Sequence, residues 1–169
     1  MYYINIFVIK IDSCSLIYSI KMNLIDNLRK FYSELVISPA IKKEVIDQGK
    51  IKGYSDALIA EQNLERGIIK IHTPKSLLTN LNLGMGEIEI LSLAIEENSP
   101  CLIDDINAQM IGIKLNIDLK SIPLILLELL KKGSITIPDY DNFLEKYGKI
   151  VHISHIEFWF YKKLGEVVK

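Results

Sequence analysis

Short apolar runs alternate along this chain with segments whose apolar residues recur at helical spacing. The runs predict strands at residues 2–11, 34–38, 68–72, 101–103 and 117–119. The helical spacing predicts a helical segment at 16–32 with a break near Asn23, and helices at 40–47, 55–66, 87–97, 106–115, 123–132, 138–146 and 155–168. Strands that alternate with helices indicate an α/β fold with a mostly parallel central sheet flanked by helices.

Residues with strong preferences at helix ends support these boundaries. Ser38 followed by Pro39 provides an N-cap residue and a proline at the first helical position. We expect the helix at 40–47 to end near Gly49 and the helix at 55–66 to be closed by Gly67.

The chain has the size of a single domain. Its 169 residues include 49% hydrophobic residues, enough for one core, and they contain no internal repeat or linker. The apolar N-terminal run is interrupted by Lys10 and Asp12 and is followed by no small-residue cleavage site, and the run at 122–130 is too short to cross a bilayer. We therefore expect one domain over residues 1–169, located in the cytoplasm and without a membrane segment.

Charge and cysteine content exclude several classes of site. The net charge of −1 provides no broad positive field for nucleic acid, so such contacts would depend on local lysine pairs at 42–43, 131–132 and 162–163. Cys14 and Cys101 are too few for a disulfide framework and lack the spacing of a zinc site. No histidine has an evident place beside either cysteine, which argues against a catalytic thiol.

Five acidic residues occupy positions that the predicted topology brings to one edge of the sheet. Asp12 ends the first strand, and Asp104 and Asp105 end the strand at 101–103. Glu44 and Glu87 lie in helices between the strands. In parallel α/β sheets, binding sites form outside the carboxyl ends of the strands. Each acid alone also has a structural interpretation as a helix cap or a first-turn acid, but two adjacent acids exceed the need for one cap.

Clustered carboxylates raise one another's pKa values unless a cation neutralises them. A site made only of carboxylate oxygens suits Mg²⁺ or Mn²⁺. One or two such ions activate water and stabilise a leaving oxygen during displacement at phosphorus. The absence of histidine or cysteine from the set favours hydrolysis of phosphodiester bonds over hydrolysis of peptide bonds.

Four segments resemble a known family when taken in order. They are IDSCSLI, SPAIKKEVIDQGK, NLGMGEIEILSLAIEENSPCLIDDINAQMIGIKLNI and IPLILLELLKKGSI. Their order and spacing resemble PIN domains, in particular an archaeal-type subgroup related to VapC-like toxins. The resemblance covers about residues 4–135, leaving a C-terminal helical extension at about 138–169. It implies a three-layer fold with the central sheet between helices.

The resemblance also implies roles for the acidic residues. Asp12 resembles the first metal ligand, Glu44 the second acid, and Glu87 the third, while Asp105, or the pair with Asp104, resembles the fourth. The hydroxyl of Ser13 resembles a group that hydrogen-bonds a ligand or a water molecule.

These roles imply an Mg²⁺- or Mn²⁺-dependent endoribonuclease that cleaves RNA. Relatives of the VapC type further imply a toxin with an antitoxin partner, and similar PIN domains imply a homodimer. Cys14 stands where relatives commonly carry serine, threonine or asparagine, and Gln109 stands where the subgroup usually has arginine. Both departures predict weaker catalysis.

Two other functions are compatible with parts of the pattern. A PIN-like module with weak or no catalysis would act through protein or RNA binding, as the two departures suggest. A phosphatase or receiver domain is disfavoured, because Ser13-Cys14 follows Asp12 where a phosphatase needs a second aspartate, and the acidic pair comes late in the chain. The aromatic residues of the C-terminal run at 156–161 would stack on bases or pack against protein, and we favour packing.

Overall fold

The central feature is a parallel β-sheet. The computed structural model describes residues 8–168, and within them the sheet has five strands in the order β3-β2-β1-β4-β5. Every pair of neighbouring strands is parallel. The strands are β1 (Val8–Ile11), β2 (Glu34–Ile37), β3 (Ile69–Ile71), β4 (Cys101–Leu102) and β5 (Leu119–Lys120). The predicted α/β class with a parallel sheet is confirmed.

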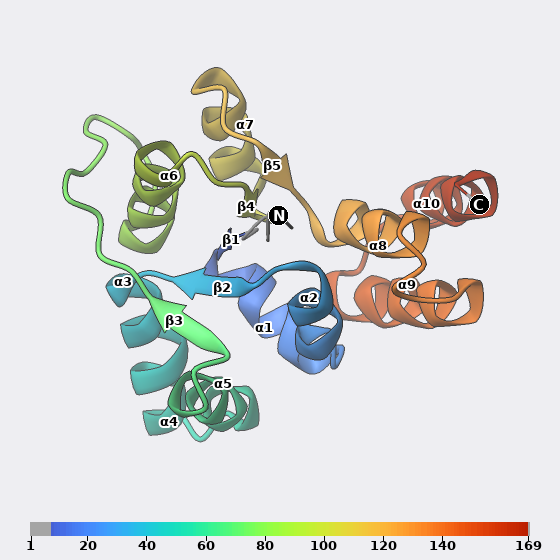
Figure 1. The fold of residues 1–169 in the computed structure, drawn as a ribbon, viewed down its shortest axis with the longest axis horizontal. Coiled ribbons are helices and arrows are strands. Elements are labelled where there is room, and N and C mark those ends of the chain that lie inside the picture. Colours follow the sequence, from blue (N-terminus) through green and yellow to red (C-terminus); the bar gives the residue numbers. More distant parts are fainter. Residues whose placement is uncertain (1–7, 169) are drawn as a thin grey trace, which may run out of the picture.

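Helices follow each strand and surround the sheet (Figure 1). They are α1 (Ser13–Lys21), α2 (Ile25–Phe31), α3 (Pro39–Ile41), the π-helical segment η1 (Lys42–Gln48), α4 (Gly49–Ile51), α5 (Ser55–Glu65), α6 (Met85–Glu97), α7 (Ile106–Lys114), α8 (Ile122–Lys131), α9 (Ile137–Val151) and α10 (His155–Val167). The last three pack on one another at one end of the molecule, to the right in Figure 1. Within residues 8–168, no helix combines the length and apolar character needed to cross a membrane.

Most predicted strands lie where the sequence placed them. Residues 2–7 of the first predicted strand fall outside the described residues. The strand predicted at 117–119 is displaced, because β5 begins only at Leu119. Asn116 adopts a left-handed backbone with φ of 56°, and the Ile117 N–H donates to the Gly112 carbonyl. These residues complete the end of α7, so they are not free to pair in the sheet.

The helix predicted at 40–47 is longer than expected. It runs through η1 and continues past Gly49 to Ile51. Gly49 has a packing role instead of a terminating one, because a Cβ there would lie 2.8 Å from the Ala57 Cβ. Its lack of a side chain lets α5 pack closely on this helix. The π-helical turns of η1 carry Glu44, and such turns are frequent at functional sites.

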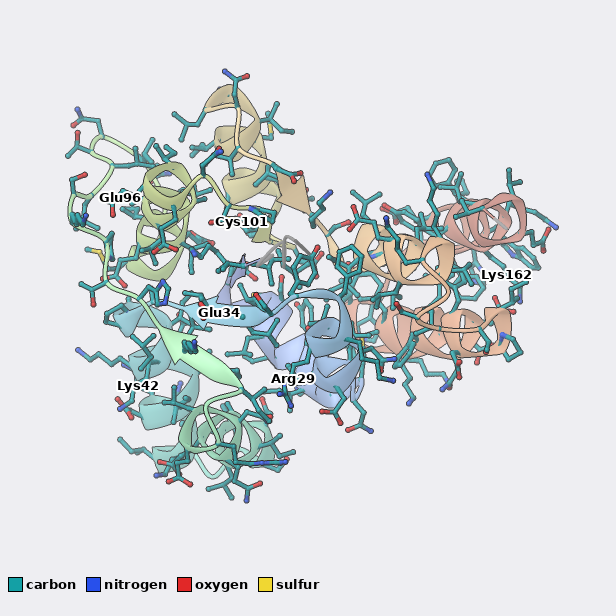
Figure 2. All side chains as sticks on the ribbon, viewed as in Figure 1. Arg29, Glu34, Lys42, Glu96, Cys101 and Lys162 are labelled. Carbon is teal, nitrogen blue, oxygen red and sulfur yellow. The ribbon has the colours of Figure 1, made fainter. Side chains whose placement is uncertain are left out.

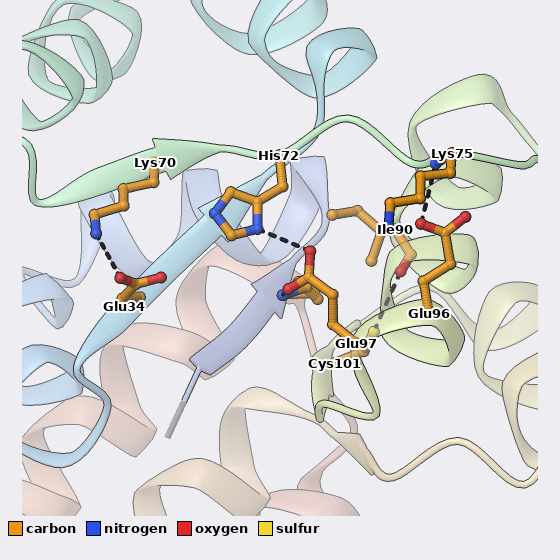
Figure 3. A network of polar contacts seen from close by, with 9 residues as sticks. Glu34, Lys70, His72, Lys75, Ile90, Glu96, Glu97 and Cys101 are labelled. Atoms are coloured by element: carbon orange, nitrogen blue, oxygen red, sulfur yellow. Dashed lines mark hydrogen bonds and ion pairs between the residues drawn. The ribbon is translucent and has the colours of Figure 1, made fainter. Parts of the chain in front are cut away.

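An ion pair between a buried lysine and a partly exposed glutamate links α6 to the central strand. Lys10 lies in β1 with no exposed surface, and its ammonium group pairs with Glu97 at the end of α6. The Glu97 carboxylate also contacts His72 Nδ1 at 2.9 Å, as Figure 3 shows. The pair therefore anchors the C-terminal end of α6, the helix whose first turn carries Glu87.

We predict that Glu97→Ala destabilises the fold by about 3 kcal/mol, because the buried Lys10 ammonium loses its carboxylate partner. Urea unfolding measures the change. Glu166→Ala is the matched control, since it removes an ion pair whose two side chains are 65% and 50% exposed, and it should change stability little. Equal effects of the two substitutions would contradict the structural role of Lys10.

Candidate active site

The predicted acids follow the carboxyl ends of adjacent elements. Asp12 directly follows β1, and its N–H donates to the Leu102 carbonyl of β4 at 3.1 Å. This pairing sets Asp12 beside the segment that carries Asp104 and Asp105. Glu44 arrives from η1, and Glu87 from the first turn of α6.

Three of the five acids line one small pocket. Asp12, Glu44 and Glu87 surround a cavity of about 150 Å³, together with Ser13, Cys14, Gly84, Met85 and Gly86. Asp104 and Asp105 are not among the lining residues. They remain close enough to act on it electrostatically, because Asp104 raises the pKa of Asp12 and Asp105 raises the pKa of Glu87.

Each acid is oriented through one carboxylate oxygen. Asp12 Oδ1 accepts the Ser15 N–H at 2.8 Å, and Glu87 Oε2 accepts the Gly84 N–H at 2.8 Å. Asp104 Oδ1 accepts the Ile122 N–H at 3.1 Å, Asp105 Oδ1 accepts the Ala108 N–H at 2.9 Å, and Glu44 Oε2 accepts the Ser13 hydroxyl at 2.7 Å. Apart from the Ser15 side chain at Asp12 and the Tyr147 phenol at Asp104, which lower the pKa values of these two carboxyls, no further hydrogen-bond donor contacts the five carboxylates among the described residues.

A close approach of α6 brings its acid to the others. A Cβ on Gly86 would lie 3.0 Å from Ile41 Cγ1, 3.7 Å from Ser13 Oγ and 3.8 Å from Glu44 Oε2. These distances show how near the start of α6 lies to η1 and α1. A glycine at this position therefore permits three separate elements to contribute to one pocket.

Burial makes the charged form of Asp12 costly. Asp12 is 2% exposed, and burial raises its pKa from 3.8 to about 7, with further increases from Asp104 and Glu87 and a partial reduction from Ser15. Burial likewise raises the pKa of Asp104 to about 6, although the Ile122 N–H and the nearby Tyr147 phenol lower it in part. A bound cation would relieve this cost.

The described residues offer no protein cation for these acids. None of the five forms an ion pair with a lysine, arginine or histidine within residues 8–168. Within that range, no three His, Cys, Asp or Glu side chains lie close enough to hold a metal ion as they stand. The buried Asp104 Oδ2 also has no hydrogen-bond partner. Carboxylate oxygens are the donors that hard divalent cations prefer, so the chemistry of these side chains fits such an ion.

Two tyrosines beside Asp104 were not predicted from the sequence. Tyr147 of α9 lies near the Asp104 carboxylate, and its ring packs edge-on against Tyr18 of α1 at 6.3 Å between centroids. The predicted helix ended at residue 146, so Tyr147 had no assigned face. The only available signal was apolar spacing along 140–147, which indicates burial and not a partner.

The two departures from the family pattern have distinct structural consequences. Partial burial raises the pKa of Cys14 to about 11, with contributions from Asp12, Glu44 and Asp105, so its sulfur remains a neutral thiol near neutral pH. Gln109 Nε2 donates to the Ile103 carbonyl at 2.7 Å and thereby supports the backbone that leads to Asp104. Gln109 thus has a structural contact where the subgroup would place a charge.

Comparison with known proteins identifies the fold family. A family model described as a PIN domain matches residues 8–158, which covers every candidate acid and all of α9. No curated protein matches the chain.

We predict that Asp12→Asn stabilises the metal-free protein at pH 8 by on the order of 2–4 kcal/mol. The folded chain retains a proton on Asp12 between about pH 4 and pH 7, where the unfolded chain has lost it, so stability falls as the pH rises through this range. Asparagine also caps a helix, so the bond from the Ser15 N–H is retained.

Urea unfolding in EDTA at pH 4 and pH 8 measures both effects. The wild type should lose stability between the two pH values, and Asp12→Asn should lose less. Addition of Mn²⁺ should then stabilise the wild type more than the variant. A variant less stable than the wild type at pH 8 would contradict the destabilising effect of the buried Asp12 carboxylate.

Proposed function

The chain belongs to the PIN-domain family, and from that premise we propose that it is a metal-dependent endoribonuclease that hydrolyses RNA phosphodiester bonds. One observation supports the proposal: Asp12, Glu44 and Glu87 line one pocket at the carboxyl end of β1, Asp104 and Asp105 act on it electrostatically, and no lysine, arginine or histidine among the described residues forms an ion pair with any of the five. PIN domains are generally nucleases, so family membership and local electrostatics support the same conclusion.

The proposed ligands are Asp12, Glu44, Glu87 and Asp105, with Asp104 as an additional acid. Mg²⁺ or Mn²⁺, when bound, supplies positive charge that lowers the pKa of water and offsets charge on the phosphate. Asp12 contributes the most buried carboxylate. The Ser13 hydroxyl donates to Glu44 Oε2 at 2.7 Å, and this contact supports the proposal that Ser13 positions a ligand.

Asp104 is suited to proton transfer. In the metal-free protein, burial raises its pKa to about 6, close to the pH range in which a carboxylate accepts a proton, and the Tyr147 phenol lies beside it. Asp104 and Asp105 are both anchored through Oδ1 to a backbone N–H in the first turn of a helix. We propose a proton-accepting role for Asp104 because of its raised pKa, and we propose Asp105 as the ligand because the family pattern places an acid there.

The finer biological assignment follows from the resemblance of residues 82–117 to VapC-like PIN domains. We propose a toxin–antitoxin pair in which an antitoxin protein inhibits this chain, with the chain acting as a homodimer in the cytoplasm. We also propose that residues 1–169 form a single domain. Size-exclusion chromatography and co-purification with the product of a neighbouring gene test these assignments separately from catalysis.

A catalytically weak or inactive module that binds RNA or protein is the alternative. The neutral Cys14 thiol in the pocket and the engagement of Gln109 by the Ile103 carbonyl favour it, since neither residue supplies a positive charge for phosphate. The retained acids oppose it, because an idle cluster would keep its repulsive cost.

We predict that purified protein cleaves labelled RNA with Mn²⁺ and not with EDTA, and that Asp12→Asn lowers the rate by about 100-fold or more. Asp26→Asn is the matched control. This exposed acid lies in the first turn of α2, and its side chain forms no ion pair among the described residues. Cleavage by Asp12→Asn at the wild-type rate would refute the site assignment. Mn²⁺ binding without cleavage of a broad RNA panel would establish the alternative.

A further inference from the structure

The acidic pocket alone is a poor binding site for RNA. Its carboxylates repel phosphates, and its volume of about 150 Å³ lies below the range of roughly 300–1,000 Å³ usual for ligand pockets. The net charge of −1 provides no general attraction. The nucleotides beside a cleaved bond must therefore be held by a neighbouring surface.

A larger groove lies between α9 and α10. It encloses about 700 Å³, and its lining includes Trp159, Lys149, His152, His155 and one acid, Glu145. The Trp159 side chain is 53% exposed. Trp159 is thus not fully covered by this domain, and the prediction that the aromatic run packs against the domain or a partner stays a prediction.

One lysine lies beside the exposed indole, and a second lysine lines the same groove. Lys162, labelled in Figure 2, places its Nζ 5.7 Å from the centre of the Trp159 ring and also pairs with Asp141 at 3.8 Å. Lys149 is exposed and forms no ion pair among the described residues. An exposed aromatic face beside cationic groups is the combination that binds single-stranded nucleic acid, with bases stacked on the ring and phosphates near the cations.

The two helices that form the groove also reach the acidic residues. Tyr147 of α9 lies near Asp104, and the groove residues Gly148 and Lys149 follow it directly in the same helix. In α10, burial raises the pKa of Tyr161 and Asp104 raises it further, so this helix also has a side chain near Asp104. A strand of RNA in the groove would therefore lie on the helices that contact this acid.

Packing between the two helices gives the groove a fixed shape. The Tyr140 hydroxyl of α9 donates to the Tyr161 carbonyl of α10 at 2.7 Å. A Cβ at Gly165 would overlap the Tyr140 ring, so glycine allows the helices to lie in close contact. A groove that is formed before binding loses little entropy when a ligand enters.

We propose that the groove between α9 and α10 binds unpaired nucleotides of single-stranded RNA next to the acidic pocket, with a base stacked on Trp159 and a phosphate at Lys149. The choice of RNA as ligand rests on the proposed function. The binding itself requires neither a metal ion nor cleavage.

The protein contains a direct reporter for this contact, because Trp159 is its single tryptophan. Wild-type protein in EDTA is titrated with short oligouridine and oligoadenosine while tryptophan fluorescence is recorded. Stacking should quench the emission and saturate it, and an abasic oligonucleotide of equal length should quench it less. Unchanged emission at concentrations where labelled RNA binds by anisotropy would overturn the proposal.

Two variants separate stacking from charge, with anisotropy of labelled RNA as the readout. Trp159→Ala should weaken binding by roughly 5- to 150-fold and leave the salt dependence unchanged. Lys149→Gln should reduce the slope of log K against log salt by about 0.7, as expected for one lost phosphate contact on a single strand. Tyr54→Ala and Lys52→Gln are matched controls, because Tyr54 is 54% exposed and both residues are remote from the groove.

The outcomes distinguish this inference from the proposed function. Quenching in EDTA without cleavage in Mn²⁺ would support the groove and reject the nuclease. Cleavage without quenching would support the nuclease and reject the groove. A Trp159→Ala variant that binds RNA normally but changes its mass in solution would show that the groove binds protein instead, which overturns the proposal.

Discussion

The hydrogen bond from the Asp12 N–H to the Leu102 carbonyl joins the carboxyl ends of the two central strands. This hydrogen bond keeps Asp12 next to the segment that carries Asp104 and Asp105, although the carboxylates repel one another. The pairing also covers Asp12 so fully that its carboxylate loses most of its water. Pairing of β1 with β4 therefore makes the charged form of Asp12 unfavourable, and a bound cation would offset this effect. The same strand pairing thus underlies both the fold and the proposed chemistry.

The sequence was sufficient for the fold class and for the order of the acids along it. Alternating apolar runs identify strands because their spacing is local, and Asp12 and Asp104 follow such runs directly. The sequence could not distinguish Asp104 from Asp105, because that difference depends on which backbone N–H each carboxylate meets in three dimensions. It also placed a helix end at Gly49, where the deciding contact is with Ala57, a residue on another helix.

Acidic and basic side chains lie in different parts of the molecule. The candidate acids follow β1 and β4, while Lys10 in β1 is neutralised by Glu97. The groove between α9 and α10 has Lys149 in its lining and Lys162 beside Trp159. The acidic edge departs from the usual requirements of a stable fold, because it buries carboxylates without a cation partner among the described residues. Functional sites commonly carry such departures. The remaining fold supplies enough buried apolar contact to tolerate it.

The order of the strands in the sheet affects how the acidic residues come together during synthesis of the chain. β1 is synthesised early, but its neighbour β4 leaves the ribosome much later, after β2 and β3. Pairing between segments so distant in sequence forms slowly and only when both are present. The acidic edge therefore remains incomplete until the segment that carries Asp104 and Asp105 has been made and β4 has paired with β1. Asp12 and Glu44 are thus present in the growing chain before the two acids that complete the edge.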